Sequence, residues 1–161
     1  HTNDAAGTVA RLTSLEGNLT NIGPAINMIV AQRLVRKLCD KCFQFIPASR
    51  QVLIKLKKEL NGIPRETKIP KFGGGLKPGL KIPEAKGCKY CNFTGFLGRV
   101  GIFEAILVDD EMEKFILKNP SVADFRELAI KKGTVTMYQD GLIKVLLGVT
   151  TIEELERVTG E

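Results

Sequence analysis

The spacing of apolar residues near the start of the chain predicts two helices. Asp4 is a good N-cap for a helix over residues 4–15, where apolar side chains recur every three or four positions. A second helix is expected to begin near Thr20, with Pro24 tolerated in its first turn and apolar positions continuing to Val30. Each of these helices has one apolar side that needs a partner to pack against.

The pattern then changes from helical to extended and back again. From about Arg33 the residues are typical of a strand that leads into Cys39. Ser49 can cap a helix that runs to Leu60, with its leucines along one side. Residues 64–83 hold prolines, glycines and scattered lysines, a composition that predicts a loop with short extended pieces.

The last third of the chain is expected to begin with a strand and to continue as short amphipathic helices. Glycines and β-prone residues alternate there before the pattern becomes helical. The expected elements are one or two strands within 92–108, helices over 110–118 and 137–147, one helix capped by Ser121 and a last one capped by Thr150 or Thr151.

Composition adds an uneven charge to this picture. The 161 residues carry a net charge of +6, but residues 43–87 alone hold ten Lys/Arg and three Asp/Glu, a net +7. Such a segment suits nucleic acid, an acidic lipid surface or an acidic protein, and a solvated lysine-rich loop is the alternative. No apolar run approaches ~18 residues and no leader is present, so we expect a cytoplasmic protein. Because His1 is followed at once by a capped helix, we also expect a fragment of a longer chain.

All four cysteines fall in two C-x-x-C steps, Cys39–Cys42 and Cys88–Cys91. Four thiolates at this spacing suit a structural, tetrahedral Zn²⁺ site with no open position for catalysis. The 45 residues between the steps exceed the roughly 15–20 of a compact zinc ribbon, so the metal would tie together the two ends of a long insertion. A pair of disulfides and unrelated buried thiols remain as alternatives.

Four stretches together resemble the hexameric ATPases of type II secretion and type IV pilus assembly. The opening His1-Thr2-Asn3-Asp4 is similar to that family's His box, and residues 31–39 are similar to the segment before its first cysteine pair. Residues 87–96, together with Gly98-Arg99-Val100-Gly101-Ile102-Phe103-Glu104, are similar to its second cysteine pair and the strand after it, and residues 140–154 are similar to its tail. The resemblance covers nearly the whole chain except about residues 46–86.

The resemblance implies an α/β fold and three segments. Residues 1–38 would be the distal part of a RecA-like ATPase domain, residues 39–91 a tetracysteine zinc-binding subdomain with a basic insertion, and residues 92–161 the return strand with a C-terminal bundle of short helices. The sequence contains no G-x-x-x-x-G-K-[ST], so these residues alone have no loop to hold the phosphates of a nucleotide. The chain by itself is therefore not expected to hydrolyse ATP, whereas an intact motor would use ATP and Mg²⁺.

The same resemblance assigns roles to single residues. His1 would be the catalytic-site residue that senses the γ-phosphate in the intact motor, and an expression-tag remnant is the alternative. Arg99 would bind nucleotide or lie at a subunit interface, and a structural salt bridge is as good a reading. Glu104 is expected to pair with a basic group. We also expect Tyr90 and Phe93 to pack over the metal and shield it.

A second group of expectations concerns structure and partners. Asp4 is expected to cap a helix and Arg36 to be structural, whereas Arg33 is open between a structural and a phosphate-binding role. The resemblance implies a homo-hexamer that meets an inner-membrane platform protein and an adaptor, with acidic lipid contact by the basic insertion. The chain would then be cytoplasmic and peripheral to the inner membrane through its partners.

Two other classes of function were weighed against a motor. A stand-alone zinc-ribbon module that binds nucleic acid is disfavoured because Phe72 is the one aromatic residue between residues 50 and 86. A thiol oxidoreductase is disfavoured because neither C-x-x-C step begins a helix in a thioredoxin-like pattern.

Overall fold

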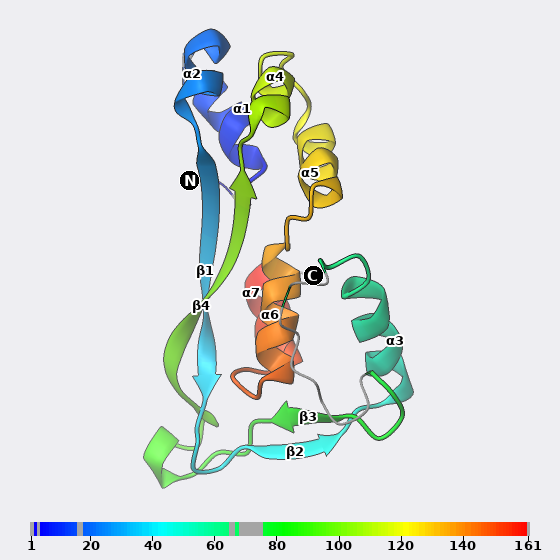
Figure 1. Cartoon of the computed structure of the whole chain (residues 1–161). Coiled ribbons are helices and arrows are strands. Elements are labelled where there is room, and N and C mark those ends of the chain that lie inside the picture. The colour runs from blue at the N-terminus through cyan, green and yellow to red at the C-terminus, as the bar shows by residue number, and fades with distance from the viewer. Residues whose placement is uncertain (1, 3, 16–17, 65–66, 68–75, 161) are drawn as a thin grey trace. The chain divides into compact units, whose positions relative to one another are not determined.

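The computed structural model describes residues 2, 4–15, 18–64, 67 and 76–160. The fold is mixed α/β, and the chain divides into two compact units, each made of two separate stretches (Figure 1). Unit 1 comprises residues 1–32 and 103–137, and unit 2 comprises residues 33–102 and 138–161. In the described part of the chain, no helix has the length and apolar character needed to cross a membrane.

Two long strands pass from one unit to the other. β1 (Met28–Leu38) and β4 (Phe96–Leu107) pair in a two-stranded sheet. The unit boundary falls between residues 32 and 33 in β1 and between residues 102 and 103 in β4. Each unit is therefore completed only by residues from both ends of the chain, and each is described separately below.

Unit 1 packs four short helices against its parts of β1 and β4. The helices are α1 (Gly7–Ser14), α2 (Leu19–Ala25), α4 (Asp110–Ile116) and α5 (Val122–Lys131). Their apolar sides meet in one core because each helix presents side chains at three- and four-residue spacing. The largest side chains of this core are those of Ile29, Ile106, Met112, Ile116 and Phe125.

The described residues of unit 2 form a small two-stranded antiparallel sheet, three helices and one 3₁₀ turn, besides its parts of β1 and β4. β2 (Gln44–Pro47) pairs antiparallel with β3 (Lys81–Glu84), Gln44 lying opposite Glu84 and Pro47 opposite Lys81. The helices are α3 (Arg50–Glu59), α6 (Met137–Leu146) and α7 (Ile152–Thr159), and the 3₁₀ turn is η1 (Lys89–Cys91). The fully buried side chains here include Val35, Leu38, Leu56, Leu142, Leu146 and Leu155.

Helices α6 and α7 approach each other closely at one glycine. A Cβ atom at Gly141 would lie 2.2 Å from Cδ1 of Leu155, well inside van der Waals contact. The absence of a side chain at position 141 is thus what allows Leu155 to occupy its fully buried site.

Three of the predicted helix caps are confirmed. Ser49, Ser121 and Thr151 each accept a hydrogen bond from a backbone N–H of the following helix. These caps were recognisable because a side-chain oxygen at the N-cap satisfies a backbone donor that the helix leaves unpaired.

The first two helices differ from the prediction at their ends. α1 begins at Gly7, and the Asp4 carboxylate accepts a 2.8 Å hydrogen bond from the Gly7 N–H, so Asp4 stabilises the turn before the helix. Asn18 caps α2, and Pro24 lies near the end of that helix, so its expected place in the first turn was wrong. Val30 belongs to β1, because pairing with β4 overrides the helical spacing of the apolar residues.

Candidate metal centre

The four cysteine sulfurs gather at one point of unit 2. Their Sγ atoms all lie within 4.8 Å of one another. The Cys39 and Cys88 sulfurs are 3.9 Å apart, and the Cys91 sulfur lies 3.8 Å from those of both Cys42 and Cys88. Four ligands about 2.3 Å from a tetrahedral Zn²⁺ are separated by about 3.8 Å. Three of the six sulfur–sulfur distances thus match a tetrahedral four-thiolate site, and the other three do not exceed 4.8 Å.

Backbone hydrogen bonds hold the two cysteine pairs together. Cys39 directly follows the last residue of β1, and its N–H donates to the Gly95 carbonyl at 2.9 Å. The Cys42 N–H donates to the Cys39 carbonyl at 3.2 Å, which folds the first C-x-x-C step into a tight turn. The Cys91 N–H donates to the Cys88 carbonyl at 3.1 Å in the same way. Each step therefore points both of its sulfurs to one side.

The sulfur of Cys91 accepts two backbone hydrogen bonds. The donors are the N–H groups of Cys88, at 3.2 Å, and Gly95, at 3.3 Å. Burial raises the pKa of the Cys91 thiol, but the two backbone donors, together with the neighbouring thiols of Cys42 and Cys88, lower the pKa to about 6. Burial raises the pKa of Cys42 to about 12 in spite of a hydrogen bond from the Gly87 backbone. One thiol thus ionises readily, whereas a second thiolate beside it requires a compensating cation.

The second cysteine pair sits in a strained turn, residues 88–95, which we call the knuckle turn. Gly95 adopts a φ of +79°, and a Cβ there would lie 2.7 Å from the Cβ of Ala85. Asn92 and Phe93 also adopt left-handed backbone angles, with φ values of 50° and 60°. This conformation costs about 1–2 kcal/mol for a residue with a side chain, and it is an outlier for a bulky one. The knuckle turn is therefore held in a conformation that most residues avoid.

The prediction that Tyr90 and Phe93 shield the metal was wrong. Their side chains are 76% and 72% exposed, respectively, so both rings face solvent. The sulfurs are instead enclosed by the chain itself, because Cys39 and Cys91 are buried beneath the turns that carry them. An aromatic residue next to a cysteine suggested burial, but the left-handed backbone at residues 92 and 93 turns Phe93 outwards.

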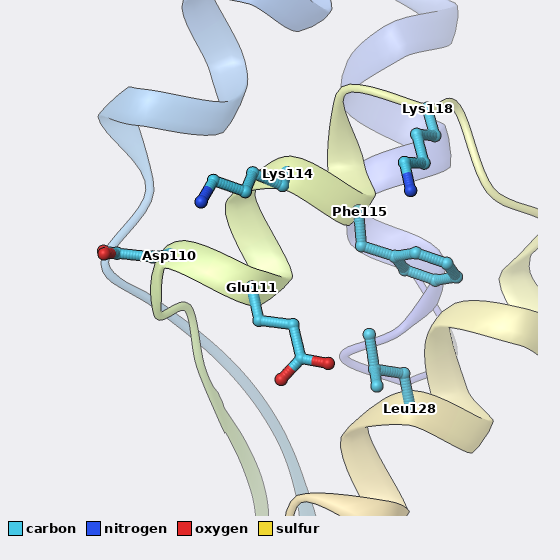
Figure 2. Close-up of a pocket in the computed structure, with 6 residues that line it drawn as sticks. All are labelled: Asp110, Glu111, Lys114, Phe115, Lys118 and Leu128. Atoms are coloured by element: carbon cyan, nitrogen blue, oxygen red, sulfur yellow. The ribbon is translucent and has the colours of Figure 1, made fainter.

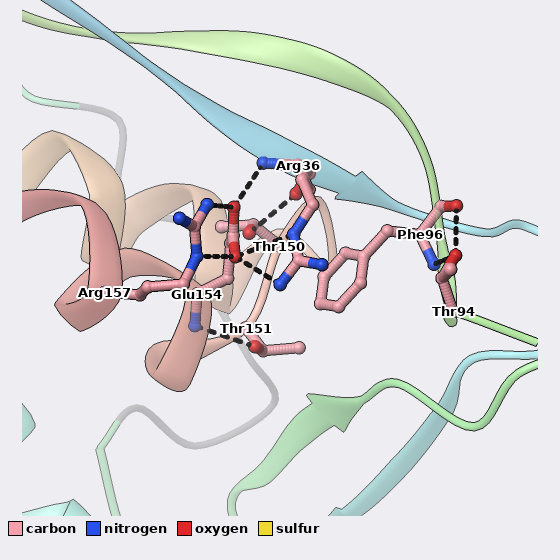
Figure 3. Close-up of polar contacts among 7 residues, drawn as sticks. All are labelled: Arg36, Thr94, Phe96, Thr150, Thr151, Glu154 and Arg157. Carbon is pink, nitrogen blue, oxygen red and sulfur yellow. Dashed lines mark hydrogen bonds and ion pairs between the residues drawn. The ribbon is translucent and has the colours of Figure 1, made fainter.

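A charged network anchors the strand that delivers Cys39 (Figure 3). The Glu154 carboxylate accepts hydrogen bonds from the backbone N–H, Nε and Nη2 of Arg36 at 2.7–2.9 Å, and two more from the guanidinium of Arg157. Burial alone would raise the pKa of Glu154, but the Arg157 and Arg36 donors lower it to about 2. The Arg36 guanidinium also lies 4.2 Å from the ring centroid of Phe96. The structural role expected for Arg36 is confirmed.

Two threonines complete this network. The Thr150 hydroxyl donates to the Arg36 carbonyl at 2.9 Å, and the Thr151 hydroxyl caps α7, as Figure 3 shows. The Leu38 N–H donates to the Val149 carbonyl at 2.8 Å. The hydrophobic pattern gave no sign that Glu154 is buried, and its pairing with Arg36, 118 residues earlier in the chain, was missed.

Glu104 has different partners from those expected. It is buried, and its two carboxylate oxygens accept the backbone N–H groups of Ala5 at 3.0 Å and Met137 at 3.2 Å. The expectation of a basic side-chain partner is therefore corrected: the donors to this carboxylate are main-chain N–H groups. The carboxylate joins the turn before α1 to the first residue of α6.

The remaining predicted residues do not converge with the cysteines. Arg33 donates to the Val158 carbonyl at 2.6 Å, and the Asp4 carboxylate pairs with Arg126. Arg99 is exposed, and within the described part of the chain no carboxylate forms an ion pair with it. His1 lies outside the described residues, so its predicted role stays a prediction.

Unit 1 has an open pocket between α4 and α5 (Figure 2). Its volume is about 490 Å³. The floor is formed by Phe115 and Leu128, and charges of both signs surround it (Figure 2). These side chains belong to Asp110, Glu111, Lys114 and Lys118. The pocket contains no cluster of ligands or nucleophiles that would define a chemistry.

The chain is similar to known proteins along almost its whole length. The family model described as "Type II/IV secretion system protein" matches residues 1–157. A type IV pilus assembly ATPase of Thermus thermophilus is 35% identical over 155 residues, which cover 96% of this chain and 16% of that protein. The type II secretion system protein E of Pectobacterium carotovorum is 34% identical over 165 residues, covering 100% of this chain and 28% of that protein.

The similarity extends to other pilus proteins of the same name. The type IV pilus assembly ATPase of Acinetobacter baylyi is 34% identical over 161 residues, which cover 100% of this chain and 26% of that protein. The chain thus spans between 16% and 28% of the length of these three curated relatives.

Proposed function

Because the chain belongs to the type II/IV secretion system protein family, we propose that it forms the C-terminal part of a hexameric P-loop ATPase that powers type IV pilus assembly or type II protein secretion. The observation that carries this proposal is identity of 34–35% along essentially the whole chain to proteins named for those two machines. In this proposal β1, β4 and the helices of unit 1 are the distal part of a RecA-like domain, and the three-segment division of the chain stays a prediction.

The four cysteines are proposed to hold one structural Zn²⁺. The spacing of the sulfurs, the ionisable Cys91 thiol and the closed set of four ligands support zinc over a catalytic metal. When bound, the ion supplies charge compensation and a rigid link between the end of β1 and the knuckle turn. Binding free energies of roughly 10–16 kcal/mol in small zinc peptides are ample to fix these two segments.

The nucleotide chemistry is proposed for the intact motor rather than for these 161 residues. No P-loop occurs among them, so Mg²⁺ and ATP would be bound mainly by residues outside this sequence. His1 would sense the terminal phosphate, and Arg99 would reach a nucleotide or a neighbouring subunit. The exposure of Arg99 supports this role, because its guanidinium is available to an incoming anion.

The proposed partners are those of a cytoplasmic motor that works at the inner membrane. A platform protein and an adaptor would receive the motion that ATP hydrolysis drives, and the basic segment between the cysteine pairs would face acidic partners or lipid head groups. α3 supports this role, because its exposed residues include Arg50, Lys57 and Lys58.

The metal proposal is tested by the zinc content of protein prepared without added metal, together with a count of reactive thiols. We expect one zinc per chain and no reactive thiol until a chelator is added. Cys91→Ser should lose the zinc, whereas Thr94→Ser, a conservative change in the same turn, should retain it. Zero zinc with four reactive thiols would overturn the metal site.

The motor proposal is tested separately with the complete coding sequence. A protein that continues upstream of His1 into a P-loop domain is expected to hydrolyse ATP, and a P-loop lysine→alanine variant is expected to be inactive. Absence of a P-loop within about one domain's length of His1 would refute the motor, whatever the zinc measurement shows.

A further inference from the structure

Two exposed aromatic rings project from the knuckle turn without any packing role in the fold. Tyr90 and Phe93 are 76% and 72% exposed, and Phe93 has a φ of 60°. A glycine or asparagine would adopt that backbone angle with less strain, and a polar side chain would be better hydrated there. The turn therefore presents apolar surface at a position where folding alone favours neither the residue type nor its conformation.

The surroundings of these rings are positively charged. The segments 37–43 and 84–99 together carry five Lys/Arg and two acidic residues, a net charge of +3. Four thiolates with one Zn²⁺ would contribute −2, which still leaves a net charge of +1. Both carboxylates are already paired, because Asp40 lies 3.4 Å from the ammonium of Lys37 and Glu84 lies 3.1 Å from that of Lys86. Lys41, Lys89 and Arg99 are exposed around the turn.

We propose that the knuckle turn is a membrane-interface anchor, which inserts Tyr90 and Phe93 into the head-group layer of an anionic bilayer while the neighbouring cations contact lipid phosphates. The choice of a membrane as the partner rests on the proposed function, which brings the chain to one. The contact itself is deduced from the exposed rings and the local charge, and it is distinct from the proposed contact of α3 and the rest of the basic segment.

A bilayer interface suits this turn better than water does. A tyrosine ring has an apolar body and a polar hydroxyl, so it is stable at the boundary between acyl chains and head groups. Surface-bound elements with aromatic and basic residues enter about 5–10 Å into that boundary. Each nearby Lys or Arg adds attraction to anionic lipids, and this attraction weakens with added salt. A zinc-fixed turn would keep both rings extended before they meet the membrane.

The chain offers an unusually clean probe of insertion, because it contains no tryptophan. Phe93→Trp places a single indole at the proposed site, and Leu107→Trp places one at a residue of unit 1 that is also 72% exposed. Both zinc-loaded variants are mixed with vesicles of phosphatidylcholine alone or of phosphatidylcholine with an equal part of phosphatidylglycerol. We expect a blue-shifted emission and quenching by brominated acyl chains for Phe93→Trp with the anionic vesicles, and neither for Leu107→Trp.

Sedimentation with the same vesicles measures the contribution of the two rings. Tyr90→Ser combined with Phe93→Ser should bind anionic vesicles at least about tenfold more weakly than the unchanged chain, because most of the buried apolar area is lost. Ile54→Ser removes a 59% exposed apolar side chain from α3 and should bind normally. If Ile54→Ser weakens binding and the double variant does not, α3 makes the lipid contact and the proposal is overturned.

The remaining outcomes are also decisive. No vesicle binding by the zinc-loaded chain would overturn the membrane anchor and would direct the search to a protein pocket for the two rings. Equal indole shifts at positions 93 and 107 would show unspecific adsorption and would refute it as well. Zinc content is measured for each variant, so loss of the metal site is distinguished from loss of the anchor, and the ATPase test of the complete protein stands apart from both.

Discussion

Replacing Gly95 by alanine should damage the metal centre far more than the same replacement at Gly98. Both glycines have nearly the same left-handed angle, with φ values of 79° and 81°. An alanine at either position costs about 1–2 kcal/mol for this backbone angle. A Cβ at position 95 would additionally lie 2.7 Å from the Ala85 Cβ, whereas a Cβ at position 98 meets nothing within 4 Å. Overpacking of this kind adds about 1–3 kcal/mol.

The cost of the backbone angle and the cost of overpacking together predict that Gly95→Ala lowers the free energy of unfolding by about 2–5 kcal/mol. Gly98→Ala has only the first cost and should lower it by about 1–2 kcal/mol. Gly95 also donates to the Cys91 sulfur and accepts from the Cys39 N–H, so the displaced turn should lower zinc affinity. The additional 1–3 kcal/mol corresponds to about 5- to 150-fold weaker zinc binding. Competition with a chromophoric chelator measures this ratio, and urea denaturation of the zinc-loaded protein measures stability.

A second substitution, at Ala85, tests whether the close approach of this residue to Gly95 causes the loss. Ala85→Gly removes the atom nearest to the new side chain, although the Ala85 backbone would still lie 3.3 Å away. Gly95→Ala combined with Ala85→Gly should therefore recover most of the lost zinc affinity. Equal losses for Gly95→Ala and Gly98→Ala, or no recovery in the double variant, would show that the close approach at Gly95 does not shape the site.

Substitutions at three further buried sites, with their controls, test the packing within each unit by denaturation. The pKa of Glu154 in the folded protein, about 2, lies below its ordinary value of 4.5. The ionised carboxylate should therefore stabilise the folded state by about 3 kcal/mol above pH 4.5, and this contribution should be lost as the pH falls to 2. Glu154→Gln should abolish this pH dependence of stability, and an unchanged pH dependence in the variant would contradict the network. Glu104→Ala leaves the backbone N–H groups of Ala5 and Met137 unpaired and should lower the free energy of unfolding by about 3 kcal/mol. Both amide hydrogens should then exchange with solvent faster than in the unchanged chain. Glu104→Gln should cost less stability. Gly141→Ala should lower the melting temperature by forcing Leu155 from its site, whereas Gly23→Ala in α2 meets ordinary contacts of 3.4 Å or more and should not; similar shifts for both would refute this packing.

The sequence was sufficient where structure is determined by neighbouring residues. The caps at Ser49, Ser121 and Thr151 need only an oxygen and the N–H groups two or three residues later, so they were predicted correctly. The gathering of the cysteines was also predictable, because two C-x-x-C steps bring their ligands together by local turns. The identity of the ion stays a prediction.

Features that depend on distant partners were not accessible in this way. β2 and β3 have four residues each and contain Pro47 and Pro83, so neither has a clear strand pattern until the two are paired. Val30 fits a helix or a strand by its spacing, and β4 decides between them. The close approach of Gly95 to Ala85 and the burial of Glu154 likewise arise from contacts that no local periodicity records.

The long separation of the two cysteine pairs has a consequence during protein synthesis. Cys39 and Cys88 are 49 residues apart, and a ribosome adding about 5–20 residues per second needs roughly 2–10 seconds to make that interval. During that time the nascent chain contains Cys39 and Cys42 but not yet Cys88 and Cys91, so it offers only two of the four metal ligands. The last part of unit 2, residues 138–161, emerges later still. Under the proposed zinc site, all four ligands are thus synthesised before the core of unit 2 is complete, and a chain made without zinc would lack the metal link between the end of β1 and the knuckle turn.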